Sequence, residues 1–523
     1  MPGLGRARCG ARGGSIACRA ISDVSRSSRL SGPVAWTAGI GIVSVLFMGL
    51  VVPLGFGPDE TQHAFRAYQL SLGHLFPQIV TCADHRHLLS CHGRLHGYLL
   101  PKRRVGGEVP HTLWSVLTRV LAVSGFGTRT PHFDPQTYAP LLGETLAVPA
   151  TAFAHFENTA LYSPVNYMPE IVVFWIARHV AEPVVASLFA ARIFTGMVWV
   201  TLVTAAVAIT PRWKWLFSLV VLVPTALSQG AAISADSAAL GVTALTTAYS
   251  LHLANRGTEL RRREIAALSG LGLLIGLLKF PLVLVLVAVV AILSGVLGAG
   301  AARRWRAAAI VLPGIVAAVW WDLASNAYFV PYRNIVYPPV LRAYISQPQQ
   351  EHYLFTHLLA IPGLLWKTAS HGHLFKLNEL VGQIGEKGLP EWFAIVWLIL
   401  FLVLACGSID GPGVGRAVRG WIAGTLIVYF LGTAIALYLT WTSVGASQIS
   451  GMHGRYFTLV LVLAVPLFAG LAGNRLRISP RITAYASMAI SAGAALTTFA
   501  YTADHYYAEP PWSALSHVVS VLF

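Results

Sequence analysis

Long apolar runs, separated by short clusters of Arg and Lys, recur along most of the chain. A helix needs about 20 predominantly apolar residues to cross a bilayer. From apolar length and basic flanks we place eleven transmembrane helices, near residues 34–53, 186–209, 215–233, 236–253, 265–279, 281–299, 305–322, 391–406, 419–441, 454–473 and 482–500. The pattern predicts an all-α, polytopic membrane protein with a transmembrane domain over residues 34–501.

The basic clusters predict the orientation of these helices. Several Arg residues precede the first run, and because Lys and Arg concentrate on the cytoplasmic side, we expect the N-terminus inside. Eleven spans then place the C-terminus outside and the basic loops inside. Those loops contain Arg212 and Lys214, Arg256 and Arg261–Arg263, Arg303, Arg304 and Arg306, Arg416 and Arg419, and Arg475, Arg477 and Arg481. Segment 165–181 is apolar only over Ile171–Ile176, too short to span, so we expect it to be interfacial.

The composition supports this class of protein. Of 523 residues, 55% are hydrophobic and only 11% are charged, and the mean hydropathy is +0.63. A net charge of +16 could indicate nucleic-acid binding, but the predicted topology already accounts for it. Residues 1–33 are basic and rich in Gly and Ser, which predicts a disordered cytoplasmic tail before an uncleaved signal anchor. We therefore expect a multi-pass protein of the cytoplasmic membrane.

Two long segments, 54–185 and 323–390, fall on the predicted outer side. They hold most of the Pro, His and acidic residues that lie outside the apolar runs, and we expect function there. Residues 61–72 have helical spacing of His63, Arg66 and Leu70, which predicts an amphipathic helix along the membrane surface. Residues 502–523 are expected to form a short outward tail.

Cys82 and Cys91 lie together in the first outward segment, whereas Cys9 and Cys18 lie in the tail and Cys406 in an apolar run. A disulfide between Cys82 and Cys91 is the favoured interpretation, because only this pair is on the oxidising side. Metal binding is the alternative. The possible ligands, Cys82, His85, His87, Cys91, His92 and His96, match no regular zinc pattern.

The adjacent carboxylates of Asp59 and Glu60 follow the first apolar run directly, with His63 and Arg66 just beyond. Such a pair at the membrane surface can deprotonate a hydroxyl or hold a divalent cation. The alternative is a helix cap, since Pro58-Asp59-Glu60 is a good helix start. Capping does not explain the His and the Arg, so we favour a functional role.

Two further ionisable residues interrupt apolar sequence at predicted outward helix ends. Asp236 lies between two apolar runs, where it can belong to a site or cap the helix that starts at Ser237. Lys279 can meet a phosphate at the depth of the lipid headgroups, or it can extend to the interface simply to keep its charge in water.

The turn from Trp441 to Phe457 joins the predicted helices 419–441 and 454–473 on the outer side. Arg455 at a helix start opposes the helix dipole, which favours a bound anion or a carboxylate partner. An interfacial aromatic belt would explain Trp441 and Tyr456 but not the glycines and Arg455. We count His453 and Tyr456 with Arg455 as candidate substrate-binding residues, although a lone His at a helix end is often structural.

Six stretches, in order along the chain, resemble a bacterial family of predicted membrane proteins known as domain of unknown function 2142, which is similar to glycosyltransferases of the GT-C superfamily. The stretches are Pro58-Asp59-Glu60 with His63 and Arg66, Ser163–Pro169, Ser234-Ala235-Asp236, Leu278-Lys279-Phe280-Pro281, Val381–Gly385 before Leu389-Pro390, and Gly451–Phe457. The chain departs from the family at His453, where Gln is usual, at Thr458, where Pro is common, and at Glu386-Lys387, which replaces an aromatic-acidic pair.

The GT-C resemblance implies transfer of a sugar, with inversion, from a polyprenyl-phosphate donor to a glycan, lipid or protein acceptor of the cell envelope. It implies Asp59 as the base and Glu60 as its alternate or a metal ligand. If a divalent cation (Mg²⁺, Mn²⁺ or Ca²⁺) takes part, Asp59, Glu60 and Asp236 would bind it. It also implies that Lys279 and Arg455 bind the lipid phosphate and that His63 and Arg66 position the donor or the acceptor. The outer surface that binds the acceptor would include Arg333, His352, His371 and His373.

Two other classes of function remain open. A transporter or flippase for a lipid-linked glycan is the first, but it should show internal repeats and ionisable residues near helix centres. A non-enzymatic scaffold of envelope assembly is the second, and it would not need so many charged groups on one side. The sequence favours the enzyme over both.

Overall fold

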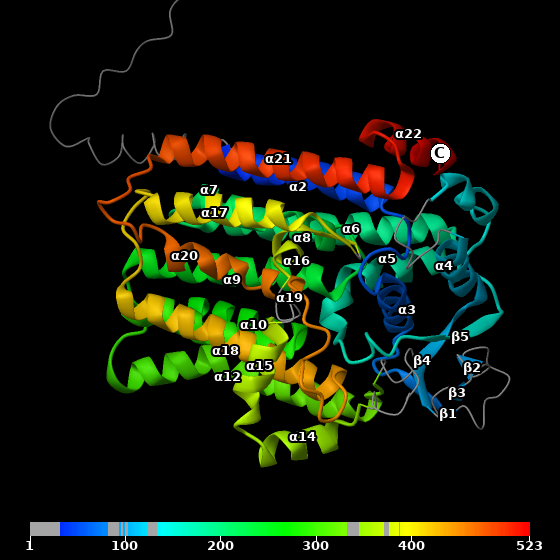
Figure 1. Ribbon diagram of the computed structural model, residues 1–523, viewed down its shortest axis with the longest axis horizontal. Helices are drawn as coiled ribbons and strands as arrows, with labels where there is room; N and C mark the ends of the chain where they lie inside the picture. Colours follow the sequence, from blue (N-terminus) through cyan, green and yellow to red (C-terminus); the bar gives the residue numbers. More distant parts are fainter. Residues whose placement is uncertain are drawn as a thin grey trace, which may run out of the picture.

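The computed structural model describes residues 32–81, 94–95, 98–99, 103–123, 133–331, 345–370, 376–385 and 387–522. It is a long helical bundle with a small β-sheet at one end (Figure 1). The all-α prediction therefore holds for the bundle but misses the sheet. The predicted disulfide Cys82–Cys91, its alternative metal ligands, and Arg333, His371 and His373 lie outside the described residues.

Five helices in the described part of the chain are long and apolar enough to cross a membrane. They are α2 (Gly32–Val51), α6 (Val184–Ile209), α12 (Gly300–Ser325), α18 (Arg416–Trp441) and α21 (Pro480–Tyr507). Each coincides with a helix that the apolar pattern predicts. The protein is therefore a largely helical membrane protein.

The other predicted spans form shorter or more polar helices in the same bundle. These are α9 (Ala235–Arg256), α10 (Arg262–Leu278), η4 (Phe280–Leu284) continuing into α11 (Val285–Ile292) and η5 (Leu293–Gly295), and α17 (Glu391–Gly407). The run at 215–233 is divided into α7 (Lys214–Val221) and α8 (Pro224–Gly230), because Pro224 lacks an N–H and disfavours helical backbone at the residue before it. The run at 454–473 is divided into α19 (Arg455–Thr458), η7 (Leu461–Leu463) and α20 (Ala464–Phe468).

Close helix packing depends on glycine where α10 crosses α12. A Cβ on Gly276 would overlap the carbonyl of Gly314, and one on Gly272 would lie 2.6 Å from the carbonyl oxygen of Ile310. Small residues let helix backbones approach in this way, which gives dispersion contacts that larger side chains would prevent. The contact fixes the end of α10, where Lys279 follows.

The basic loops gather at one end of the bundle, on the left in Figure 1. The N–H of Trp213 donates to Oδ2 of Asp410 at 2.7 Å, and the N–H of Ile478 donates to the carbonyl of Gly407 at 2.7 Å. These bonds join the loops after α6, α17 and α20. The structure thus agrees with the prediction that these loops share a side.

The opposite end carries the first long segment (Figure 1). Its three-stranded antiparallel sheet has the order β1 (Gln78–Thr81), β4 (Arg103–Pro110), β5 (Thr151–His155), with Gly106 opposite both Gln78 and His155. The other elements of this segment are α3 (Glu60–Ser71), β2 (Arg94–Leu95), β3 (Tyr98–Leu99), α4 (His111–Val123), η2 (Pro135–Leu141), η3 (Pro164–Tyr167) and α5 (Met168–His179). The short α5 agrees with the expectation that 165–181 does not span.

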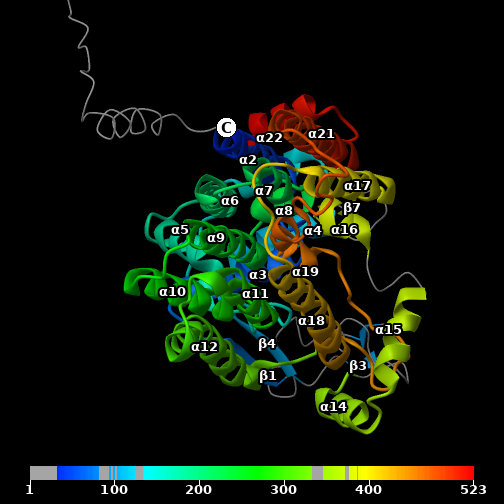
Figure 2. The same ribbon diagram turned by 90° about the vertical axis from the view of Figure 1, so that its left-hand side faces the viewer.

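The second long segment and the C-terminus complete the fold. The segment forms η6 (Asn326–Tyr328), α14 (Gln347–Thr356), α15 (Ala360–Ser370), α16 (Leu377–Gly382), β6 (Gln383–Ile384) and β7 (Lys387–Gly388). In Figure 2, α14 and α15 project from the side of the bundle. The predicted C-terminal tail is instead helical: α21 continues to Tyr507, and α22 (Pro511–Leu522) packs against η2 and α2.

The prediction that residues 61–72 lie along the membrane surface is wrong. Eleven of the twelve residues of α3 are buried, because α5 and β4 pack against this helix. Its polar face, which includes His63, Arg66 and Gln69, therefore makes internal hydrogen bonds. The helix is a central element that positions the residues before it.

Candidate functional site

Asp59 is the residue before α3, and its backbone is left-handed, with φ 55° and ψ 18°. Its side chain makes no capping hydrogen bond, so the cap interpretation does not describe the carboxylate. Asn158 instead donates from Nδ2 to Oδ1 at 2.8 Å, and Nη2 of Arg455 lies 3.6 Å from Oδ2. The side chain is 37% exposed. The carboxylate of Asp59 is therefore oriented by Asn158 and Arg455 but remains accessible to solvent.

Glu60 has a different environment. Its carboxylate receives Nε of Arg192 at 2.6 Å and Nη2 at 2.5 Å, and its side chain is only 2% exposed. The backbone N–H groups of Gly55, Gly57 and Ile233 also donate to it, at 3.0 to 3.1 Å. Burial alone would raise the pKa of Glu60, but Arg192 and the N–H groups of Gly57 and Ile233 hold it below the usual value. Its lone pairs are occupied, so the predicted role as alternate base or metal ligand is not supported.

Arg192 also ties down the end of α2. It donates from Nη1 to the carbonyls of Gly49 and Val52 and from Nη2 to that of Pro53. The pair therefore fixes the turn that leads to Asp59. We did not predict Arg192 as a site residue, although a charge inside an apolar run is a recognisable signal.

Asp236 and Lys279 form a largely buried ion pair, with side chains 10% and 12% exposed. Ser234, not the Asp236 side chain, caps α9, since its Oγ accepts the N–H of Asp236 at 3.1 Å. The ammonium of Lys279 also lies 5.4 Å from the ring centre of Tyr162 and 5.7 Å from that of Tyr456. Both residues are thus part of an internal cluster, and Lys279 does not simply extend to the interface.

Arg455 and Tyr456 connect the Asp59 and Lys279 groups. The guanidinium of Arg455 lies 5.5 Å from the ring centre of Tyr456, which in turn faces Lys279. The predicted carboxylate partner of Arg455 is therefore Asp59. The structure brings together five of the predicted residues, Asp59, Asp236, Lys279, Arg455 and Tyr456. Tyr162 and Asn158 join them without having been predicted.

His453 faces another carboxylate that the sequence did not single out. Its Nδ1 lies 3.0 Å from Oε2 of Glu379, and the same oxygen accepts the N–H of Gly454 at 3.0 Å. Burial would raise the pKa of Glu379, but His453, Lys376 and the Gly454 N–H hold it at about 2. Glu379 thereby fixes the loop that carries Arg455. The ring of His453 makes a T-shaped contact with that of Tyr456, with ring centres 5.8 Å apart.

His63 and Arg66 extend from the same face of α3 but have different surroundings. Nδ1 of His63 hydrogen-bonds the hydroxyl of Tyr167 at 2.6 Å, and its ring stacks on Tyr162. Burial lowers the pKa of His63 to about 4 despite the carboxylates of Asp59 and Asp236 nearby. Arg66 is fully buried and donates to Gln69 and to the carbonyls of Leu75 and Tyr162. Arg66 is therefore structural.

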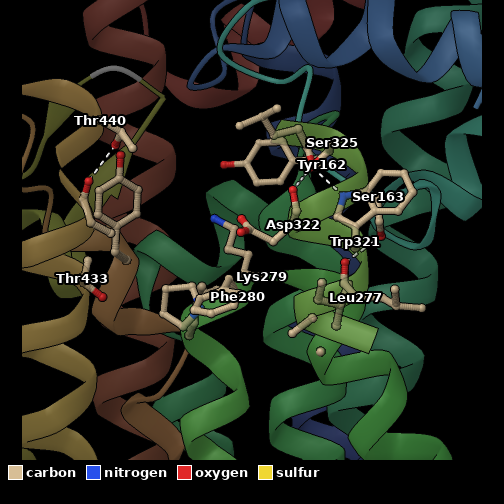
Figure 3. A pocket seen from close by; sticks show the side chains of 18 of the residues that line it. Tyr162, Ser163, Leu277, Lys279, Phe280, Trp321, Asp322, Ser325, Thr433 and Thr440 are labelled. Atoms are coloured by element: carbon tan, nitrogen blue, oxygen red, sulfur yellow. Dashed lines mark hydrogen bonds between the residues drawn. The ribbon is translucent and has the colours of Figure 1, made fainter. Parts of the chain in front are cut away.

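A cavity of about 280 Å³ opens beside this cluster, between η4, α12 and α18. Lys279, Tyr162 and Asp322 point into it (Figure 3). The polar lining also includes Tyr456, Tyr429 and Thr440, and the remainder is mainly apolar. Asp59, Asp236 and Arg455 do not line the cavity. Asp236 contacts the lining residue Lys279, and Arg455, the partner of Asp59, contacts the lining residue Tyr456. Exposed His352 on α14 does not line the cavity.

The predicted metal ligands do not form one donor set. Glu60 is paired with Arg192 and Asp236 with Lys279, and within the described residues no three His, Cys, Asp or Glu side chains are grouped for a metal ion. A divalent cation next to Asp59 would also meet the guanidinium of Arg455. The residues present therefore do not fit a divalent cation held by Asp59, Glu60 and Asp236.

Comparison with known proteins supports the family part of the resemblance. No curated protein and no solved structure matches the chain. One family model, of predicted membrane proteins, matches residues 42–464, a span that includes Asp59, Asp236, Lys279 and Arg455. The chain therefore belongs to this family, DUF2142.

Proposed function

We propose that this protein is a GT-C-type glycosyltransferase of the cytoplasmic membrane, with eleven spans and its site on the outer face. It transfers a sugar, with inversion, from a polyprenyl-phosphate donor to a hydroxyl of a glycan, lipid or protein of the cell envelope. The observation that carries the proposal is the environment of Asp59. This carboxylate is accessible and does not cap its helix, and a chain of cationic and aromatic groups links it to a cavity.

The bond changes assign a role to each part of the cluster. The acceptor oxygen forms a bond to the anomeric carbon while its proton passes to a carboxylate oxygen of Asp59. The bond between that carbon and the phosphate oxygen breaks, and its electron pair leaves with the phosphate. Cationic groups already in place stabilise that charge as it develops. Lys279, in the cavity lining, and Arg455, next to Tyr456, are the cations available.

The surrounding contacts hold these groups in place. Asn158 and Arg455 orient the Asp59 carboxylate, and Asp236 fixes the ammonium of Lys279 beside Tyr162. The apolar part of the cavity, which includes Leu277, Ala318 and Leu437, gives space for the first part of an isoprenoid chain. Preorganised partners of this kind increase catalytic efficiency because little rearrangement is needed during the reaction.

The test is sugar transfer by purified protein in detergent, with radiolabelled polyprenyl-phosphate sugars as donors. Wild type should form labelled product, and Asp59→Ala should not. Glu108→Ala is the matched control, since Glu108 is an exposed acidic residue on β4 away from the cavity. Asp322→Asn tests the other carboxylate at the cavity. Absence of transfer with every donor, or loss only in Asp322→Asn, would reject Asp59 as the base of this reaction.

A further inference from the structure

A second cavity, of about 510 Å³, lies between α11, α12 and α18 at the other end of the bundle. α12 contributes residues 303–312 to it, whereas it contributes residues 318–325 to the cavity with Lys279. Figure 2 shows α11 between α12 and α18, and both helices pack on it. The two cavities therefore lie along the same pair of helices, α12 and α18, near opposite ends.

The lining of this second cavity is apolar apart from two residues. Ten of its twelve lining residues are apolar, and the exceptions are Ser294 and Arg303. Small side chains, among them Ala307, Ala308 and Ala417, leave the space open. The helices α12 and α18 are candidate membrane spans, and Val287, Leu312 and Trp421 of the lining are exposed, so a lipid of the surrounding bilayer can reach this groove. Water gains few hydrogen bonds in such a groove, so an apolar chain is the favoured occupant.

Arg303 lies at the polar end of the groove. Its neighbour Arg306 has a carboxylate partner, Glu259, at 2.9 Å. The exposed Arg303 has no such partner within the residues that the structure describes. A cation in the first turn of α12 is repelled by the positive end of the helix dipole, and an anion bound there would offset this repulsion. Trp421, 61% exposed, lines the same cavity, and Trp favours the level of the lipid headgroups.

We propose that this groove binds an anionic phospholipid of the surrounding bilayer. One acyl chain lies along Val287, Val311 and Val418, and the phosphate pairs with Arg303. The site is remote from Asp59 and does not rest on the proposed enzymatic activity. It gives the protein a preference for membranes that contain anionic lipid.

The test is native mass spectrometry of the purified protein with phosphatidylglycerol and phosphatidylcholine that carry identical acyl chains. Wild type should prefer phosphatidylglycerol, and Arg303→Gln should lower that preference about fivefold, the effect expected from one basic residue near an anionic headgroup. Arg304→Gln is the matched control, because it removes the same charge from the next residue, which does not line the cavity. It should keep the wild-type preference.

A second variant tests the groove itself. Ala308→Phe should fill the space and lower the binding of both lipids, with the fold checked by an unchanged melting temperature. Inorganic phosphate at the lipid concentration should not compete. Equal losses in Arg303→Gln and Arg304→Gln would show a general charge effect, and competition by phosphate would show a free-anion site. Either result, or unchanged lipid binding by Ala308→Phe, would overturn the proposal.

Discussion

Glu60 and Arg192 form a buried ion pair with two hydrogen bonds, which joins the start of α3 to the first half of α6. The neighbouring carboxylate, Asp59, has a more exposed position and a longer contact with Arg455. Two adjacent acidic residues thus have separate roles. Glu60 holds the turn, and Asp59 is presented to the site.

This division predicts unequal effects on stability of two similar substitutions. Glu60→Gln leaves Arg192 without its charged partner in a buried position, and we expect a loss of about 3–5 kcal/mol in the free energy of unfolding. Asp59→Asn should change stability by less than about 1 kcal/mol, because the side chain is partly exposed. Unfolding in denaturant, followed by tryptophan fluorescence, measures both. Equal stability of the two variants would contradict the assignment of Glu60 as structural.

The sequence predicted most helices of the bundle because an apolar run long enough to span has few alternatives in a membrane. It could not predict the sheet, whose strands β1, β4 and β5 are short and come from distant parts of one segment. It also placed α3 on the surface, since a helix with polar residues is buried only when other elements supply hydrogen-bond partners. For Arg66 those partners are carbonyls such as Leu75, which no local pattern indicates.

The sequence also predicted part of the candidate site. Asp59, Asp236, Lys279 and Arg455 were recognisable because each is an ionisable residue at the end of an apolar run. The pairing of Asp236 with Lys279 and of Asp59 with Arg455 depends on the fold. Asn158 and Glu379 carry no comparable signal, because an amide or a carboxylate in a polar segment is usually exposed to solvent.

The Asp236–Lys279 pair gives a test by double substitution. Lys279→Met should lower stability by about 3–5 kcal/mol, because Asp236 is then a buried charge without its partner. Combining it with Asp236→Leu should recover most of that stability. Donor binding should stay weak in both variants, since the cation at the cavity is absent. Stability is measured by denaturant unfolding and binding by scintillation proximity. Restored donor binding in the double variant would contradict the phosphate role of Lys279.

His63 predicts a pH dependence of stability. Its folded pKa is lowered to about 4 by burial, from a usual value of 6.5. The unfolded chain therefore takes up this proton first, so the stability from this group is present above pH 6.5 and is lost as the pH falls towards 4. The loss is on the order of 3 kcal/mol.

His63→Gln can keep a hydrogen bond to Tyr167 but does not titrate. The melting temperature should therefore fall less between pH 7 and pH 4.5 in this variant than in wild type. His155, whose pKa burial also lowers to about 4, serves as the control: His155→Gln should leave the contribution of His63 in place. An identical pH profile for wild type and His63→Gln would show that His63 does not titrate as described.

Chelation tests whether sugar transfer needs a metal ion bound by Asp59, Glu60 and Asp236. Because Arg192, Lys279 and Arg455 face these carboxylates, sugar transfer should continue in excess EDTA at the rate without it. Added Mg²⁺, Mn²⁺ or Ca²⁺ should change that rate by less than about twofold, since a cation would compete with fixed positive charges. Complete loss with EDTA and recovery with one of these ions would restore the metal prediction.

The most direct measurement of the central claim compares turnover and donor binding in Asp59→Asn. This substitution keeps a hydrogen-bonding side chain next to Asn158 and Arg455 but removes the base. The rate of sugar transfer should fall by about 10²–10⁴-fold, the range for loss of a general base, while the Kd for the polyprenyl-phosphate donor stays within about twofold of wild type. Transfer at a near wild-type rate by folded Asp59→Asn would contradict the account.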